Sequence, residues 1–165
     1  MKVAVVLGSA SDENYARRIK SVLDALDVEA DFRVLSAHRT PEETVEFARR
    51  AADSGYGVII AVAGYSAALP GLLAAHTLLP VLAVPAAAGP LRGVDALLAS
   101  VQMPKGVPVA ALTVGEAGAD NAALMAARVL ALRDADLRGR LAERAEAMRR
   151  DVLDSDGELG ERLRE

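Results

Sequence analysis

The chain has no cysteine among its 165 residues, which excludes disulfide bonds, thiolate catalysis and cysteine-ligated metals. It has only two histidines, His38 and His76, and they lie far apart in the sequence, so we expect neither a metal nor another cofactor. Aromatic residues make up only 3% of the chain, whereas apolar residues make up 52%. The core must therefore consist mainly of small aliphatic side chains, which allow backbone elements to approach closely.

Basic clusters and long apolar helices are missing as well. The net charge is −4, and no Lys/Arg cluster interleaved with aromatic residues indicates a nucleic-acid surface. Residues 54–91 carry no Asp, Glu, Lys or Arg, but Pro70, Pro80, Pro85 and Pro90 divide them into pieces shorter than the ~20 residues of a membrane span. The N-terminal apolar run of about five residues is too short for a signal peptide. We therefore expect a cytoplasmic protein with neither nucleic acid nor membrane as a partner.

Apolar runs rich in β-branched residues alternate with helical patterns along the chain. Strands are predicted at residues 2–8, 30–36, 57–64, 80–85 and 107–115. Helices are predicted at residues 12–27, 41–55, 70–79, 93–101 and 119–134. The near-continuous hydrophobicity of the strands is typical of strands that are covered on both faces. The sequence therefore predicts an α/β fold with a five-stranded parallel sheet between two layers of helices.

A C-terminal helix extends this pattern. Its apolar residues recur at steps of three or four among mixed charges, at Leu137, Leu141, Ala145, Met148 and Val152. One narrow apolar stripe of this kind packs either on its own domain or on another subunit. We expect a single domain at residues 1–165, with a core at 2–134 and a C-terminal helix and tail at 135–165.

Ligands of such sheets bind beyond the carboxyl ends of the strands, so the loops that follow the strands are the candidate sites. The first loop reads "GSASD" at residues 8–12, where Ser9, Ser11 and free N–H groups of the helix N-terminus can hold an anion such as phosphate. The Asp12 carboxylate is better suited to a sugar hydroxyl. The alternative is that Ser11 or Asp12 is only an N-cap. Neither GxGxxG nor GxxxxGK[ST] occurs, which argues against a dinucleotide site and a nucleoside-triphosphate loop.

The second loop, "SAHRTPEE" at residues 36–43, contains a helix start. Thr40 as N-cap, Pro41 at the first helical position and Glu43 at the third predict a capping box. This explains the second half of the loop and leaves its first half for another role.

Ser36, His38 and Arg39 precede that cap and face the same sheet edge as the first loop. An imidazole can donate and accept a proton near neutral pH, and a guanidinium offers a permanent charge and a planar fork for phosphate. His38 is therefore either a catalytic acid and base or an incidental loop histidine. His76 is predicted about six residues into the helix that starts at Pro70, some 9 Å from the site edge, where a structural role is expected.

The third loop, "GYSAALPG" at residues 64–71, and the fourth loop, which starts at Pro85, consist mainly of Gly, Ala, Ser and Pro. Tyr65 is the only ionisable side chain between residues 57 and 75. Such a wall supplies backbone N–H groups and a close-fitting, dry surface but no strong acid or base. Proton transfer, if it occurs at this edge, then falls on His38.

Six motifs in this order resemble the N5-carboxyaminoimidazole ribonucleotide mutases of purine biosynthesis. They read "GSASD", "SAHRTP", "ALPG", "PVLAVP", "GVDALLASVQMPKGVPVA" and "AGADNAALMAARVLA", and the resemblance spans roughly residues 2–134. It implies a flavodoxin-like three-layer αβα sandwich, usually assembled as an octamer with active sites at subunit contacts. It also implies an enzyme that moves a carboxylate from an exocyclic nitrogen of an aminoimidazole ribonucleotide to ring carbon C4, without metal or ATP.

The resemblance also implies roles for individual residues. His38 would be the general acid and base, Ser9, Ser11 and Arg39 would hold the substrate phosphate, and Asp12 would hold the ribose hydroxyls. The remaining substrate-binding residues that we expect are Ser36, Gly64, Tyr65, Ser66, Ala68 and Leu69.

The third loop departs from the pattern of the mutases, which usually reads G-A-G-G-A-A-H-L-P-G. Here it is "VAGYSAALPG", so that Val62, Tyr65, Ser66 and Ala68 stand in place of Gly, Gly, Ala and His. Related carboxylases that use carbon dioxide directly carry A-G-R-S-N there, and "AGYSA" partly resembles it. "SAHRTP" and "SVQMP" look like the mutases, which favours the mutase. A direct carboxylase and a ribonucleotide-binding protein without activity are the two alternatives.

Overall fold

The sheet has five parallel strands in the computed structural model, which describes residues 1–164, the side chains of residues 160 and 161 excepted. The strands are β1 (Lys2–Leu7), β2 (Ala30–Val34), β3 (Tyr56–Ala63), β4 (Val81–Pro85) and β5 (Ala110–Ala111). Their spatial order is β2-β1-β3-β4-β5, the flavodoxin-like order. The order reverses between β1 and β3, and such a switch point is where α/β sheets bind ligands.

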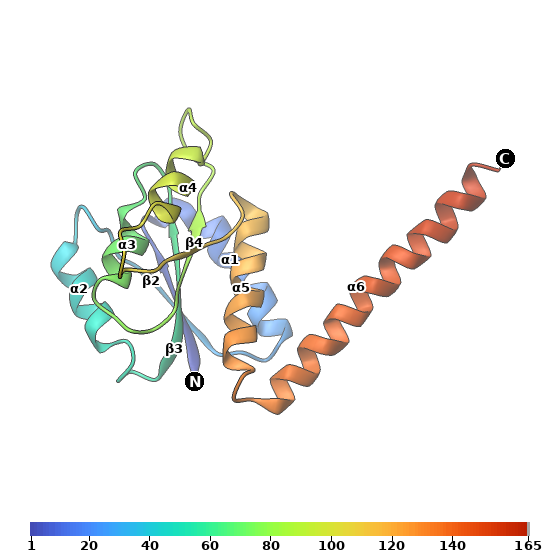
Figure 1. Ribbon diagram of the computed structural model, residues 1–165, viewed down its shortest axis with the longest axis horizontal. Helices are drawn as coiled ribbons and strands as arrows, with labels where there is room; N and C mark the ends of the chain where they lie inside the picture. Colours follow the sequence, from blue (N-terminus) through green and yellow to red (C-terminus); the bar gives the residue numbers. More distant parts are fainter. Residues whose placement is uncertain (165) are drawn as a thin grey trace.

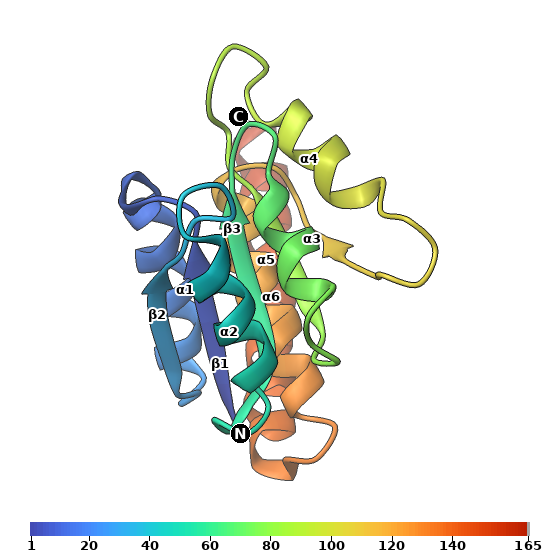
Figure 2. The same ribbon diagram turned by 90° about the vertical axis from the view of Figure 1, so that its left-hand side faces the viewer.

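Helices cover both faces of the sheet, as predicted (Figures 1 and 2). One face packs against α1 (Glu13–Ala25) and α5 (Glu116–Leu130). The other packs against α2 (Pro41–Arg50), α3 (Ala68–Ala74) and α4 (Val94–Val101). Alternate residues of each buried strand point to opposite layers, so a central strand of such a sheet must be apolar at every position.

The inner face of α5 consists mainly of alanines. Ala119, Ala122, Ala123, Ala126 and Ala127 are all fully buried against the sheet and α1. A methyl group is the smallest side chain that still excludes water, so this helix lies close to its neighbours. Because the backbones approach one another closely, the core is filled although the sequence has few aromatic side chains.

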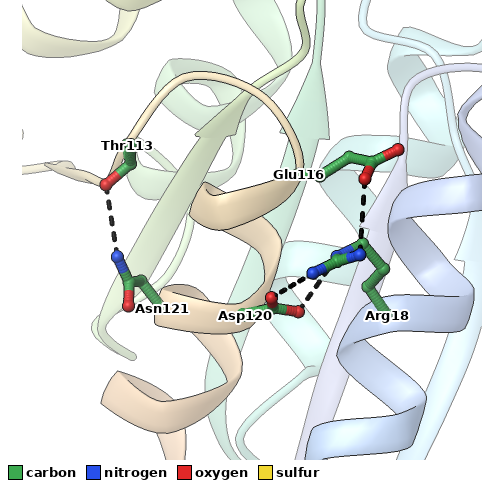
Figure 3. A network of polar contacts seen from close by, with 5 residues as sticks. All are labelled: Arg18, Thr113, Glu116, Asp120 and Asn121. Carbon is green, nitrogen blue, oxygen red and sulfur yellow. Dashed lines mark hydrogen bonds and ion pairs between the residues drawn. The ribbon is translucent and has the colours of Figure 1, made fainter. Parts of the chain in front are cut away.

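Polar contacts also join α1 to α5. Arg18 of α1 donates through Nη2 to Asp120 at 2.5 Å and through Nη1 to Glu116 at 3.3 Å, and both acids belong to α5 (Figure 3). Asn121 of α5 donates to Thr113 Oγ1 at 3.2 Å, which ties the helix to the segment that precedes it. These contacts are largely exposed and therefore fix the orientation of α5 more than they stabilise it.

Two predicted segments differ from the structure in their bounds. The fifth strand was expected at residues 107–115, but β5 pairs with β4 only at Ala110–Ala111. Pro108 has no N–H group to donate, and β5 is one of the two edge strands, where pairing on one side only is sufficient. α3 begins at Ala68 and ends at Ala74, so His76 lies beyond its C-terminus and not inside a helix as predicted.

The C-terminal helix α6 (Ala135–Arg162) projects away from the rest of the protein (Figure 1). At the base of its apolar stripe, Leu137 is buried, and Arg140 donates through Nε to the carbonyl oxygen of Leu26, the residue after α1, at 2.8 Å. Further along, Met148 is 56% exposed and Val152 is 68% exposed. The chain therefore covers only the first turns of the stripe. None of the helices in the described part of the chain has the length and hydropathy needed to cross a membrane.

Candidate active site

A cavity of about 500 Å³ lies at the carboxyl edge of the sheet, bounded by the loops that follow β1, β2, β3 and β4. Every site residue that the sequence predicts lines it: Ser9, Ser11, Asp12, Ser36, His38, Arg39, Gly64, Tyr65, Ser66, Ala68 and Leu69. The predicted set does not contain the other small residues of the wall, Gly8, Ala37, Ala63, Ala67 and Ala88. Ala88 follows β4, and its place in the fourth loop was the only signal for it.

The first loop forms a short 3-10 turn, η1 (Ala10–Asp12), before α1 begins. Ser9 caps this turn, because its Oγ accepts hydrogen bonds from Ser11 N at 3.3 Å and from Ser11 Oγ at 2.9 Å. Of the two N-caps that the alternative interpretation offered, Asp12 does hold the N-cap position of α1, but its carboxylate makes no capping hydrogen bond. That carboxylate remains available to a ligand, and burial raises its pKa above the ordinary value.

The second loop closes on itself through Thr40, and the predicted capping box does not form. Thr40 Oγ1 accepts from Ser36 N at 2.9 Å and donates to Ser36 O at 3.2 Å, so it is not free to cap α2. Pro41 does occupy the helix start, as predicted. The resulting tight loop at residues 36–40 presents His38 and Arg39 to the cavity.

Arg39 spans the gap between the first two loops. Its backbone N–H and its Nε both donate to Ser36 Oγ, at 3.2 and 3.4 Å, and its Nη2 donates to Gly8 O at 3.4 Å. These bonds are long, and the side chain is exposed, so the guanidinium keeps donors for an anion. Among the described residues, no side-chain or backbone group forms a hydrogen bond with the exposed imidazole of His38.

The third loop has an unusual backbone. Tyr65 and Ala67 have φ angles of +54° and +34°, in the left-handed region, and Ala67 N donates to Gly64 O at 3.0 Å. Ala68, the first residue of α3, is exposed at the cavity wall. This side of the cavity supplies small side chains and one phenol, and no charged group.

The cavity therefore has a polar side and an apolar side. The first two loops contribute three hydroxyls, a carboxylate, an imidazole and a guanidinium, whereas the third and fourth loops contribute an alanine-rich wall. Within the described residues, no group of three or more His, Cys, Asp and Glu side chains is placed to hold a metal. The fold and this site define a flavodoxin-like α/β protein whose ligand site lies at the switch point between β1 and β3.

The comparisons with known proteins identify the family. The family model described as AIR carboxylase matches residues 2–151, and the chain belongs to this family of enzymes. It is 47% identical over 154 residues to the N5-carboxyaminoimidazole ribonucleotide mutase of Escherichia coli (strain K12), covering 93% of this chain and 91% of that protein. It is 46% identical to the mutase of the same name from Bacillus subtilis (strain 168), covering 95% of this chain and 97% of that protein.

A solved structure agrees with the fold. The crystal structure of Treponema denticola PurE superposes with a TM-score of 0.86 at 28% identity, covering 95% of this chain and 97% of that one. The resemblance that the sequence motifs indicated is confirmed at the level of the family and the fold. The family match extends past residue 134 and ends at residue 151, inside α6.

Proposed function

We propose that the protein converts N5-carboxyaminoimidazole ribonucleotide to 4-carboxy-5-aminoimidazole ribonucleotide, a step of purine biosynthesis. One observation carries the proposal: the imidazole, guanidinium, carboxylate and hydroxyls that the resemblance assigns to this reaction all line one cavity of about 500 Å³. The named relatives are mutases of this substrate. A cavity of this size is within the range typical of small-molecule sites.

The polar side of the cavity binds the ribonucleotide. Ser9 and Ser11 donate hydroxyl hydrogen bonds to the phosphate, together with N–H groups at the start of η1 and α1. Arg39 adds charge-assisted hydrogen bonds from the neighbouring loop. Asp12 accepts from a ribose hydroxyl. This arrangement leaves the base next to His38 and the alanine-rich wall.

His38 carries the protons of both half-reactions. In the first, the bond between the exocyclic nitrogen and the carboxylate carbon breaks, its electron pair stays on nitrogen, and the nitrogen takes a proton from the imidazolium. Carbon dioxide and aminoimidazole ribonucleotide result. In the second, C4 attacks the carbon dioxide, and the C4 proton passes to the neutral imidazole. The imidazolium is restored, so no proton is gained or lost overall.

The apolar wall suits the intermediate. Carbon dioxide is small and uncharged, so hydrogen bonds cannot hold it, and it escapes unless the site is closed and close-fitting. Ala63, Ala67, Ala68 and Ala88 provide such a surface opposite the polar loops.

An assay with two substrates tests the proposal. Purified protein is mixed with N5-carboxyaminoimidazole ribonucleotide or with aminoimidazole ribonucleotide plus bicarbonate, and the C4-carboxylated product is followed. We expect wild type to use the first substrate and His38→Asn to be inactive. Turnover that needs only aminoimidazole ribonucleotide and bicarbonate, with the N-carboxylated compound ignored, would contradict the mutase.

The third loop favours a second candidate, a carboxylase that takes carbon dioxide directly. Two features support it. The sequence "AGYSA" at residues 63–67 partly resembles that of the carboxylases, and Ala68, which lies on the cavity wall, stands where the mutases have a histidine. A ribonucleotide-binding protein without activity is the third candidate. It predicts saturable binding with no conversion and no difference between wild type and His38→Asn.

We also propose that residues 1–165 form one domain and that α6 holds together a homo-oligomer, with the octamer as the expected size. The support is the uncovered end of the apolar stripe, at Met148 and Val152. The double variant Met148→Asp, Val152→Asp should give a smaller particle by size-exclusion chromatography with light scattering. An unchanged mass would contradict this role. We place the reaction in the cytoplasm, because a phosphorylated ribonucleotide does not cross a bilayer unaided.

A further inference from the structure

Tyr65 adopts a backbone conformation that bulky residues avoid. Its φ of +54° lies in the left-handed region, where the β-carbon of an L-residue crowds the following carbonyl and glycine is the residue without this strain. The residue lies two positions after the end of β3, on the cavity wall. Strained positions of this kind cluster at functional sites, where the surrounding structure holds them. A large side chain at this position therefore requires an explanation in terms of what its ring contacts.

The ring contacts the fourth loop at Gly89. A β-carbon at Gly89 would lie 2.7 Å from Tyr65 Cε1 and 3.2 Å from Tyr65 Cδ1, so the ring lies directly over this residue's backbone. Gly89 itself has a φ of +64°. The two positions are complementary: a tyrosine occupies the left-handed position of the third loop, and a glycine in the fourth loop leaves space for its ring.

The fourth loop is a firm support for this ring. Tyr15, a buried residue of α1, accepts a hydrogen bond at its hydroxyl from Ala87 N at 2.9 Å. Gly64, the residue before Tyr65, packs on the same loop, since a β-carbon at Gly64 would lie 3.1 Å from Ala88 Cβ. The third and fourth loops are thus in contact from Gly64 to Tyr65, along the side of the cavity that faces the polar loops.

We propose that Tyr65 is a positioning residue that decides the fate of the carbon dioxide formed in the first half-reaction. Its ring closes the seam between the third and fourth loops, so that the carbon dioxide stays against C4 and is recaptured. The proposal rests on the proposed function. It assigns the effect to the ring and not to the hydroxyl, because the ring contacts Gly89 whereas, within the described residues, the Tyr65 hydroxyl has no hydrogen-bond partner.

The experiment measures how the aminoimidazole ribonucleotide formed in the first half-reaction partitions between release and carboxylation at C4. N5-carboxyaminoimidazole ribonucleotide is supplied with ¹³C-labelled bicarbonate. Two products, the C4-carboxylated ribonucleotide and released aminoimidazole ribonucleotide, are quantified, together with the label in the carboxylated product. We expect Tyr65→Gly to raise the ratio of released to carboxylated ribonucleotide by about tenfold, which corresponds to ~1.4 kcal/mol in the partition. The label incorporated per product should rise with it. A change that only loosened the fold would lower turnover and leave this ratio unchanged.

Two further variants separate the ring from the backbone and from the hydroxyl. Tyr65→Asn removes the ring but introduces a residue that tolerates the left-handed conformation without the backbone freedom of glycine. Its ratio of released to carboxylated ribonucleotide should equal that of Tyr65→Gly. Tyr65→Phe keeps the ring and should retain the wild-type ratio. Circular dichroism and thermal unfolding establish that each variant is folded.

The outcomes are distinguishable. If wild type converts the N-carboxylated substrate but Tyr65→Gly partitions as wild type does, the inference is overturned and the proposed function stands. If Tyr65→Phe partitions as Tyr65→Gly does, the hydroxyl acts and the ring does not, which also overturns it. If wild type does not convert the substrate, both proposals fall together.

Discussion

The two ends of the parallel sheet differ in whether their polar side chains have hydrogen-bond partners. At the amino end, Lys2 Nζ donates to Asp31 at 2.6 Å and the Tyr56 hydroxyl donates to the same carboxylate at 2.7 Å. At the carboxyl end, Asp12 makes no side-chain capping bond and His38 has no hydrogen-bond partner within the described residues. Groups that satisfy one another stabilise a fold, whereas groups left without partners are free for a ligand.

The same residue type shows this difference in its titration. Hydrogen bonds from Lys2 and Tyr56 lower the pKa of Asp31, whereas burial raises the pKa of Asp12. A carboxyl held ionised by partners belongs to the structure, whereas at Asp12 the effect of burial outweighs that of a backbone hydrogen bond at Ser9, which leaves the carboxyl open to a new donor. Substitutions at the two ends should therefore separate stability from activity.

The largest expected effect is that of His38→Asn on turnover. Loss of a general acid and base should lower conversion of the N-carboxylated ribonucleotide by roughly 10²–10⁴-fold. Thermal unfolding should be unchanged, because the exposed imidazole contributes no packing. A variant that kept most of its activity would remove His38 from the mechanism.

Arg39→Lys should act on binding at the same end. Lysine keeps the charge but loses the planar fork, and a hydrogen bond to a charged group is worth about 1.5–3 kcal/mol, so KM should rise roughly 10- to 100-fold while kcat changes little. Steady-state kinetics measure both constants. A drop in kcat at unchanged KM would instead place Arg39 in the chemical step.

Tyr56→Phe should show the reverse behaviour at the amino end. It removes the hydroxyl that donates to Asp31 and keeps the buried ring, so the free energy of unfolding should fall by about 1 kcal/mol. Urea unfolding measures this, and conversion of the ribonucleotide, followed in parallel, should stay at the wild-type rate.

The smallest effect concerns pH. Because the pKa of folded Asp31 is lowered, its stabilisation is present above the ordinary carboxyl range and is lost as the pH falls through the lowered value. Because the pKa of folded Asp12 is raised, its ionisation opposes folding as the pH rises from the ordinary value through the raised one. Urea unfolding of Asp31→Asn and Asp12→Asn between about pH 3 and pH 6 should therefore deviate from wild type with opposite slopes. Parallel curves would show that the two ends do not differ in this respect.

The order of the elements could be predicted from the sequence because the apolar runs and helical patterns are local signals. The site could be placed because the carboxyl ends of parallel strands share one edge, which brings Asp12, His38 and Tyr65 together from three separate loops. The details that failed depend on competition between partners. Thr40 has the residue type of a cap, but Ser36 engages its hydroxyl first.

The contact of Tyr65 with Gly89 could not be predicted either, since it joins two loops that are 24 positions apart (89 − 65). The shortness of β5 could not be predicted either, because it also depends on residues outside the segment. Its sequence resembles a strand, but how far it pairs depends on where β4 ends and on Pro108, and neither is visible in the periodicity of the segment.

The alanine face of α5 limits how this protein can vary. A larger side chain at Ala122 or Ala126 would push the helix away from the sheet and strain the core, by typically 1–3 kcal/mol. The one smaller residue, glycine, weakens a helix interior by about 1 kcal/mol. Substitution is thus opposed in both directions, unlike in a leucine-rich core, where leucine, isoleucine and methionine can replace one another. We expect the sequence of α5 to drift on its outer face only, and its inner face to be the least tolerant surface of the fold in a library of single substitutions.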